Sequence, residues 1–282
     1  MKIAKMVLLF GLSFFIAASV AQAIEIGPAP TSTSLNGDGT FAVSSASVSK
    51  SSVKGFGGGT IYYPNTAGSY GVIAVCPGFT ESSSVVTWFA KRLATFGFVT
   101  IAMNTNSIWD NPDSRATQLK AALDYMVNSS SSAIRARIDS SRRAVAGHSM
   151  GGGGTLVASG QDSTLKAGIA LEPYNTTTNL WNVTVPVLIF GADGDSIAPI
   201  KNHATPMYNS LPVVTKKAYA VLNGATHFTS NKTDERVGRY GVAWAKLFID
   251  GDTRYSPFLC GAEAAAYQTS ARFDSYQSNC PY

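Results

Sequence analysis

The side chains best suited to chemistry include a serine enclosed by glycines, in the run Gly147-His148-Ser149-Met150-Gly151. The run fits G-x-S-x-G, the pattern of a nucleophile elbow, in which a serine sits on a sharp turn between a strand and a helix. An apolar stretch, Arg143–Gly147, precedes the serine and a helical pattern follows it, as such a turn requires. Side chains in place of the two glycines would collide with neighbouring backbone. We therefore expect Ser149 to be a nucleophile.

A serine hydroxyl is a weak nucleophile and needs a general base, for which the chain offers 3 histidines. His148 adjoins Ser149, and neighbours in so sharp a turn point in different directions. His203 lies in a polar stretch at the expected start of a helix, where a surface position is expected. His227 follows the apolar run Lys217–Leu222, and open α/β sheets gather their functional residues at the C-terminal ends of strands. The sequence therefore favours His227 as the base.

The acid that orients this base is expected between Ser149 and His227, at the end of another strand. The run Val187–Ala192 ends in Asp193-Gly194-Asp195, and spacing does not choose between the two aspartates. Glu172, which follows the run Ala167–Leu171, is a weaker third candidate. With any of them, the order serine, acid, histidine matches that of α/β-hydrolases.

An oxyanion hole needs two backbone N–H groups close to the nucleophile. One is expected from Met150, the residue after the serine. The other is expected from the loop Cys76–Thr80, which follows the first central strand, with Phe79 as the natural donor. The ring of Phe79 and the side chain of Met150 would also form an apolar floor for an acyl group.

Strands that alternate with helices are expected to position these residues. Short apolar runs, typical of strands buried on both faces, lie at Gly71–Cys76, Phe98–Met103, Arg143–Gly147, Ala167–Leu171, Val185–Ala192 and Lys217–Leu222. Two more strands are predicted near Phe41–Val48 and at Gly59–Tyr63, and helices at Thr87–Phe96, Asp113–Val127, Ile134–Ile138, Thr155–Ser159 and Arg236–Phe248. This alternation predicts an α/β fold with a mostly parallel central sheet flanked by helices on both faces. No long apolar segment is left over to form a lid.

Residues 1–23 have the pattern of a signal peptide that is removed on export. Lys2 and Lys5 form a positive start, Val7–Ala18 is apolar, and Ala21-Gln22-Ala23 fits the cleavage rule. The apolar run is shorter than the about 20 residues of a membrane-spanning helix, so no membrane anchor is predicted. We expect a secreted, monomeric protein in which residues 24–282 form one domain.

The charged residues and cysteines narrow the class further. The net charge of +5 comes from scattered residues without a basic run, which disfavours nucleic-acid binding. Cys260 and Cys280 lie in an irregular C-terminal tail and are expected to form a disulfide in an oxidising compartment. Cys76 ends an apolar run and is expected to be a buried, unreactive thiol.

Together these motifs resemble the bacterial cutinases and polyester hydrolases, a group that includes enzymes acting on poly(ethylene terephthalate). The resemblance extends from the region of Lys50 to the end of the chain. It rests on Phe56–Pro64, Pro112–Arg115, Gly147–Gly154, Gly191–Pro199, Gly224–His227, Asp252–Tyr255, Phe258–Cys260 and the final Cys280-Pro281. It implies the α/β-hydrolase fold and a catalytic triad of Ser149, Asp195 and His227, with oxyanion amides at Phe79 and Met150.

The resemblance also implies further substrate contacts. An aromatic residue that follows the proline of a strand-end loop flanks the acyl group in this family, and Glu172-Pro173-Tyr174 puts Tyr174 there. Ile197, within Gly191–Pro199, is implied as another substrate contact. Many relatives carry Trp in place of Tyr174 and Tyr in place of Phe79, and both replacements keep apolar contact.

Some thermophilic relatives bind calcium through residues that match Asp193, Asn223 and Asp274. Because Asn223 is neutral, the site would have one charge fewer, and no tight calcium site is expected. No organic cofactor or metal is needed for the expected reaction.

The expected function is that of a secreted serine ester hydrolase that works through an acyl-enzyme. Polyesters such as cutin or poly(ethylene terephthalate) and short-chain acyl esters are the expected substrates, bound in a shallow open cleft. The alternative is a triacylglycerol lipase or general carboxylesterase with the same triad. An inert binding module with this fold is disfavoured because the triad is intact.

Overall fold

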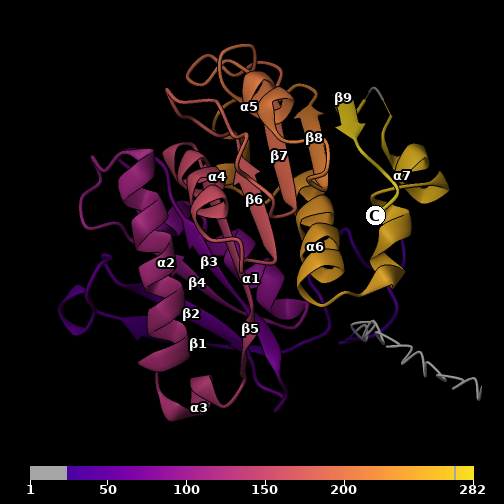
Figure 1. Cartoon of the computed structure of the whole chain (residues 1–282). Coiled ribbons are helices and arrows are strands. Elements are labelled where there is room, and N and C mark those ends of the chain that lie inside the picture. Colours follow the sequence, from indigo (N-terminus) through magenta and orange to yellow (C-terminus); the bar gives the residue numbers. More distant parts are fainter. Residues whose placement is uncertain (1–23, 270) are drawn as a thin grey trace, which may run out of the picture.

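The computed structural model describes residues 24–269 and 271–282, which build a sheet of nine strands in the order β1-β2-β4-β3-β5-β6-β7-β8-β9 (Figure 1). The strands β3 to β8 run parallel, whereas β1, β2 and β9 join their neighbours antiparallel. Their bounds are β1 Val43–Val48, β2 Gly59–Pro64, β3 Tyr70–Cys76, β4 Phe98–Met103, β5 Ile138–His148, β6 Ala167–Leu171, β7 Val187–Ala192, β8 Lys217–Leu222 and β9 Phe273–Ser278.

Helices cover both faces of this sheet. One face carries α1 (Thr87–Thr95) and α6 (Glu235–Ile249), which contact each other. The other face carries α2 (Pro112–Asn128), α4 (Met150–Gln161) and α5 (Ala204–Ser210). The short helices α3 (Ser132–Arg135) and α7 (Ala262–Tyr267) lie in the connections before β5 and before β9. The arrangement, with the strand order above, is the α/β-hydrolase fold predicted from the sequence.

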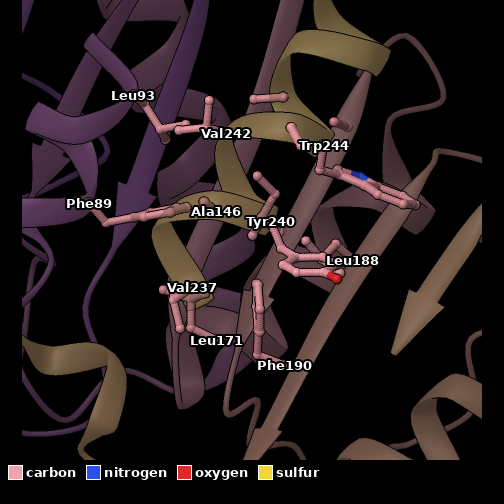
Figure 2. Close-up of a cluster of buried hydrophobic side chains, with 14 of the residues drawn as sticks. Phe89, Leu93, Ala146, Leu171, Leu188, Phe190, Val237, Tyr240, Val242 and Trp244 are labelled. Carbon is pink, nitrogen blue, oxygen red and sulfur yellow. The ribbon is translucent and has the colours of Figure 1, made fainter. Parts of the chain in front are cut away.

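Alternate residues of the central strands build two cores, one on each face. In β3, Ile73 and Val75 pack toward α1 and α6, whereas Val72, Ala74 and Cys76 pack toward α2. Burying a side chain of the size of Val, Ile or Leu stabilises the fold by about 1.5–3 kcal/mol, so each apolar residue of these strands helps to hold the sheet between its two layers of helices. Figure 2 shows part of the first core, where side chains from α1, α6 and the strands meet: Phe89, Leu93, Ala146, Leu171, Leu188, Phe190, Val237, Tyr240, Val242 and Trp244.

Two of the helices predicted from the sequence had bounds that were too short or misplaced. The predicted helix Thr155–Ser159 is the middle of α4, because the glycines of its first turn weaken the helical pattern. These glycines serve packing instead: a Cβ at Gly154 would lie 2.9 Å from the Cβ of Arg115 on α2. The predicted helix Ile134–Ile138 was wrong at its end, since β5 already begins at Ile138.

The sequence suggested an irregular C-terminal tail, but this part of the chain contains α7 and β9. A disulfide joins Cys260 to Cys280, with 5.9 Å between the Cα atoms, and so ties the end of β9, which pairs with β8, to the segment before α7. The predicted pairing is therefore confirmed. Cys76 is free and buried, as expected, and burial raises the pKa of its thiol to about 11.

The predicted signal peptide, residues 1–23, lies outside the described residues. Among the helices of residues 24–269 and 271–282, none is long and apolar enough to cross a bilayer.

Candidate active site

Ser149 lies on the turn between β5 and α4, with φ 53° and ψ −119°. This left-handed conformation is rare for a residue other than glycine and indicates a backbone held by its surroundings. The two flanking glycines are required for it. A Cβ at Gly147 would lie 2.5 Å from the carbonyl of Gly151, and a Cβ at Gly151 would lie 2.4 Å from the carbonyl oxygen of Cys76. The backbone N–H of Ser149 donates to the carbonyl of Leu171 on the neighbouring strand (2.9 Å).

A continuous hydrogen-bonded chain leads away from this serine. Ser149 Oγ donates to Nε2 of His227 (2.9 Å), and Nδ1 of His227 donates to Oδ2 of Asp195 (2.8 Å). Ser149 follows β5, Asp195 follows β7 and His227 follows β8, so all three lie at the C-terminal edge of the parallel strands. The exposed fractions of Ser149, Asp195 and His227 are only 6%, 7% and 4%. A base held against a serine by a buried carboxylate can take the proton of that serine.

The structure distinguishes the three acids that the sequence left open. Asp195 alone contacts His227, and its other oxygen accepts the backbone N–H groups of Ile197 (2.9 Å) and Ala198 (2.7 Å). Burial alone would raise the pKa of Asp195, but these hydrogen bonds and the one from His227 outweigh it and hold the pKa below its ordinary value. The carboxylate of Asp193 instead accepts the N–H groups of three residues in its own and the next loop: Gly194, Gly224 and Ala225.

Glu172 is buried and contacts neither Ser149 nor His227 directly. Its Oε1 accepts a hydrogen bond from Ser230 Oγ (2.9 Å), whereas its Oε2 has no partner among the described residues. Burial raises its pKa to about 8, so this side chain holds a proton at neutral pH. The sequence placed it correctly at the end of a strand but gave no sign that it would be uncharged.

Two backbone N–H groups beside Ser149 are free of protein acceptors within the described residues, those of Phe79 and Met150. Met150 opens α4, so its N–H lies at the positive end of a helix. In the loop after β3, the N–H groups on either side of Phe79 are both engaged: that of Gly78 by the carboxylate of Glu81 (2.6 Å) and that of Thr80 by the carbonyl of Ile108 (2.9 Å). The arrangement leaves two donors for an oxyanion.

A fully buried arginine holds this loop against the next one. Arg115 on α2 donates to the carbonyl oxygens of Pro77 (3.0 Å), Ile108 (3.0 Å) and Asp110 (2.7 Å). The loop with Phe79 is thereby joined to the loop with Trp109. Sequence reasoning noticed Arg115 only as part of a shared motif and assigned it no role.

The rim of the site is apolar and exposed. The exposed fractions are 42% for Phe79, 65% for Trp109 and 49% for Ile197. The rings of Phe79 and Trp109 meet edge to face, with 5.2 Å between centroids. Sequence reasoning missed Trp109, although a tryptophan in a polar loop is a recognisable signal of a contact surface.

On another side of the site, Tyr174 is half-buried and packs against His203, with 4.5 Å between ring centroids. His203 also has Nδ1 2.9 Å from the carbonyl oxygen of Asn175. His203 is partly exposed and directly precedes α5, in keeping with the surface position expected at the start of a helix, but its packing against Tyr174 was not expected from the sequence.

His148 points away from Ser149, as expected for its place in the turn. Its side chain is fully buried and bridges two residues that sequence reasoning did not connect: Nε2 donates to the carbonyl oxygen of His227 (2.7 Å) and Nδ1 lies 2.9 Å from Glu81. No local pattern could have found this bridge, because its members come from three different loops.

Comparison with known proteins extends over most of the chain. A family model described as PETase, PET hydrolase-like, matches residues 18–281. The chain is 50% identical over 266 residues to the cutinase est1 of Thermobifida alba, covering 94% of this chain and 89% of that protein. It is 50% identical over 267 residues to the cutinase cut1 of Thermobifida fusca, covering 94% and 83%. It is 47% identical over 261 residues to a bis(hydroxyethyl) terephthalate hydrolase of Streptomyces coelicolor, covering 92% and 82%.

Proposed function

Because the chain belongs to the PET hydrolase-like family and is a carboxylic ester hydrolase, we propose that Ser149, His227 and Asp195 are its catalytic triad. The observation that carries the proposal is the unbroken chain of hydrogen bonds from Asp195 through His227 to Ser149. The strained backbone of Ser149 supports it as well, since strain of this kind is kept where function requires it.

In the proposed mechanism, Ser149 Oγ attacks the ester carbonyl while His227 Nε2 takes its proton. The negative oxygen of the tetrahedral intermediate accepts hydrogen bonds from the N–H groups of Phe79 and Met150. Asp195 stabilises the imidazolium, which then gives its proton to the leaving alcohol. A water molecule, activated by the same histidine, hydrolyses the acyl-enzyme. The steps need no metal or organic cofactor.

We propose polyesters and short acyl esters as substrates. The apolar rim of Phe79, Trp109 and Ile197 suits a polymer segment that lies across the site, because these side chains are exposed rather than folded over Ser149. Tyr174 would flank an aromatic acyl group. The relatives named as cutinases and as a bis(hydroxyethyl) terephthalate hydrolase support this substrate class. The alternative remains a lipase or general carboxylesterase with the same triad.

We further propose that residues 1–23 are removed on export and that residues 24–282 act outside the cell as a single, monomeric catalytic domain. The disulfide between Cys260 and Cys280 supports an oxidising compartment.

The decisive test measures release of p-nitrophenol from p-nitrophenyl butyrate by residues 24–282 and by the Ser149→Ala variant. We expect the variant to lose about 10³-fold or more in kcat. Equal rates in both proteins would reject Ser149 as the nucleophile. A polyester film, soluble short-chain esters and emulsified triglyceride, compared at equal enzyme concentration, then separate the substrate classes. Cleavage of long-chain triglyceride alone would favour the lipase alternative.

A further inference from the structure

One carboxylate, that of Glu81, contacts three of the loops around Ser149. Its Oε2 accepts hydrogen bonds from the N–H of Gly78 (2.6 Å) and from Nδ1 of His148 (2.9 Å), and its Oε1 accepts one from Nδ2 of Asn231 (2.7 Å). Gly78 precedes the proposed oxyanion donor, His148 precedes the proposed nucleophile, and Asn231 lies in the short turn after the proposed base. A single side chain thus joins the segments that carry the proposed oxyanion donor, nucleophile and base, whose distances from one another must stay fixed during the reaction.

Both ring nitrogens of His148 face acceptors. Nε2 lies 2.7 Å from the carbonyl oxygen of His227, which can only accept, so Nε2 carries a proton. Nδ1 lies 2.9 Å from an oxygen of Glu81 that already accepts a backbone N–H, so Nδ1 carries a proton too. Burial would lower the pKa of His148, but the hydrogen bond to Glu81 and its charge outweigh burial and raise the pKa. The two residues therefore form an ion pair, with His148 as imidazolium.

The charges around this pair are few. The ring centroid of His227 lies 4.9 Å from that of His148, and Asp195 lies behind His227. Glu172, at the end of β6, also acts on His148, but with a pKa of about 8 it is neutral at neutral pH. Glu81 is therefore the carboxylate that balances the buried charge of His148.

We propose that Glu81 and His148 form a positioning pair, which fixes the Phe79 N–H and the base His227 relative to Ser149. The inference rests on the function proposed above, in which these three residues carry out the reaction. Glu81 holds the backbone beside Phe79, while His148 holds the backbone of His227 directly. The ion pair between them sets the distance from oxyanion donor to base, and a site of this kind tolerates errors of only about 0.5 Å.

The charge of the pair is part of this role. In a Glu81→Gln variant the amide oxygen can still accept the N–H of Gly78, but the buried imidazolium loses its counter-ion and releases a proton. A neutral His148 can keep only one of its two hydrogen bonds to acceptors. The link between the oxyanion loop and the histidine loop is then broken, although the volume of the side chain is unchanged.

The first experiment measures kcat and KM for p-nitrophenyl butyrate in Glu81→Gln, His148→Asn and the double variant. We expect each single change to lower kcat about 10- to 100-fold, because the oxyanion donor is displaced rather than deleted. KM should stay within about twofold, since the pair does not touch substrate. The double variant should be no worse than the more impaired single variant, because both changes break one link. Asp124→Asn, which removes an exposed carboxylate paired with Arg143, is the matched control and should leave kcat unchanged.

Counting active sites separates positioning from a general loss of structure. A fluorophosphonate that reacts with Ser149 gives the number of active sites in each preparation. We expect Glu81→Gln to be labelled in full and to turn over more slowly at each site. A variant that had only lost stability would show fewer sites, each with the wild-type kcat, and this result would overturn the inference.

A measurement on the unaltered protein guards against variants that do not fold. The chain has 3 histidines, so the ring ¹⁵N signals can be assigned one by one. We expect His148 to show two protonated nitrogens at pH 7. A neutral ring for His148, full multiplicative loss in the double variant, or wild-type kcat in Glu81→Gln would each overturn the inference. Failure of the proposed function is distinct from all of these, because it would appear as an inactive wild type or an active Ser149→Ala protein.

Discussion

A Glu172→Gln variant should become more stable relative to the wild type as the pH rises. The pKa of Glu172 is about 8 in the folded protein, against 4.5 for an unperturbed glutamate. Between these two values the unfolded chain releases this proton and the folded protein keeps it, so wild-type stability falls with increasing pH. Glutamine does not titrate, has nearly the same shape and can still accept the hydrogen bond from Ser230.

The size of the effect follows from the gap between the two pKa values. Each pH unit within that gap is worth about 1.4 kcal/mol, so the full difference approaches about 5 kcal/mol above pH 8. Below pH 4.5 both states of the wild type hold the proton, and the variant should differ from it by about 1 kcal/mol or less.

Urea unfolding of both proteins, followed by tryptophan fluorescence at intervals from pH 4.5 to 9, measures this difference directly. Glu25→Gln removes the same group from an exposed ion pair with Arg254 and serves as the matched control. Effects of other titrating residues are common to both proteins and cancel in the difference. A difference between wild type and Glu172→Gln that stays constant over the whole range would refute the reasoning, because Glu172 would then ionise alike in the folded and unfolded chain.

Three further outcomes are expected. Replacing Cys260 and Cys280 together by serine should lower the free energy of unfolding by about 3 kcal/mol, because the bridge joins residues 20 positions apart. Calorimetry should show a Tm lower by about 6–12 °C. An unchanged Tm would contradict this. Trp109→Ala should slow hydrolysis of a polyester film about 3- to 10-fold and leave p-nitrophenyl butyrate turnover unchanged. The control Trp181→Ala, which removes an exposed tryptophan in the loop before β7, should change neither rate. Equal slowing on both substrates would argue against a rim contact of Trp109. Asp193→Asn should cost less than about 1 kcal/mol at pH 7. The carboxylate accepts three backbone amides, and hydrogen bonds hold its pKa low against the effect of burial, but the residue is exposed and solvent screens its charge. That cost should shrink as the pH falls below 3.8, the ordinary pKa of aspartate, and vanish once the wild-type carboxyl is protonated in the folded protein as well. A cost that does not change with pH would show that charge is not its origin.

The sequence predicted the central sheet well because buried parallel strands are short, apolar and separated by helical patterns. The nucleophile elbow at Ser149 could also be predicted, because the turn needs glycines two positions before and two positions after the serine. The identity of the acid was not clear from spacing alone. Asp193 and Asp195 are separated by one residue, and only the turn after β7 decides which carboxylate reaches His227.

What the sequence could not reveal depends on contacts between distant residues. Glu81 and His148 are 67 positions apart and belong to different loops, so no periodicity connects them. The antiparallel strand β9 escaped notice because its polar residues lack the apolar run of the central strands. In both cases the information lies in tertiary packing, which overrides local preference.

The position of β9 has a consequence for the solubility of the protein. The strand it covers, β8, is buried in five of its six residues and carries the apolar segment Ala-Tyr-Ala-Val-Leu. Once uncovered, such an edge offers unpaired backbone groups to the same edge of another molecule, which is the first step of strand-to-strand aggregation. β9 closes that edge with a strand in which Asp274 and Gln277 are exposed. The bridge from Cys260 to Cys280 therefore helps to keep β9 in place over the edge of β8. Reducing conditions should promote aggregation of the protein at temperatures well below those that unfold it.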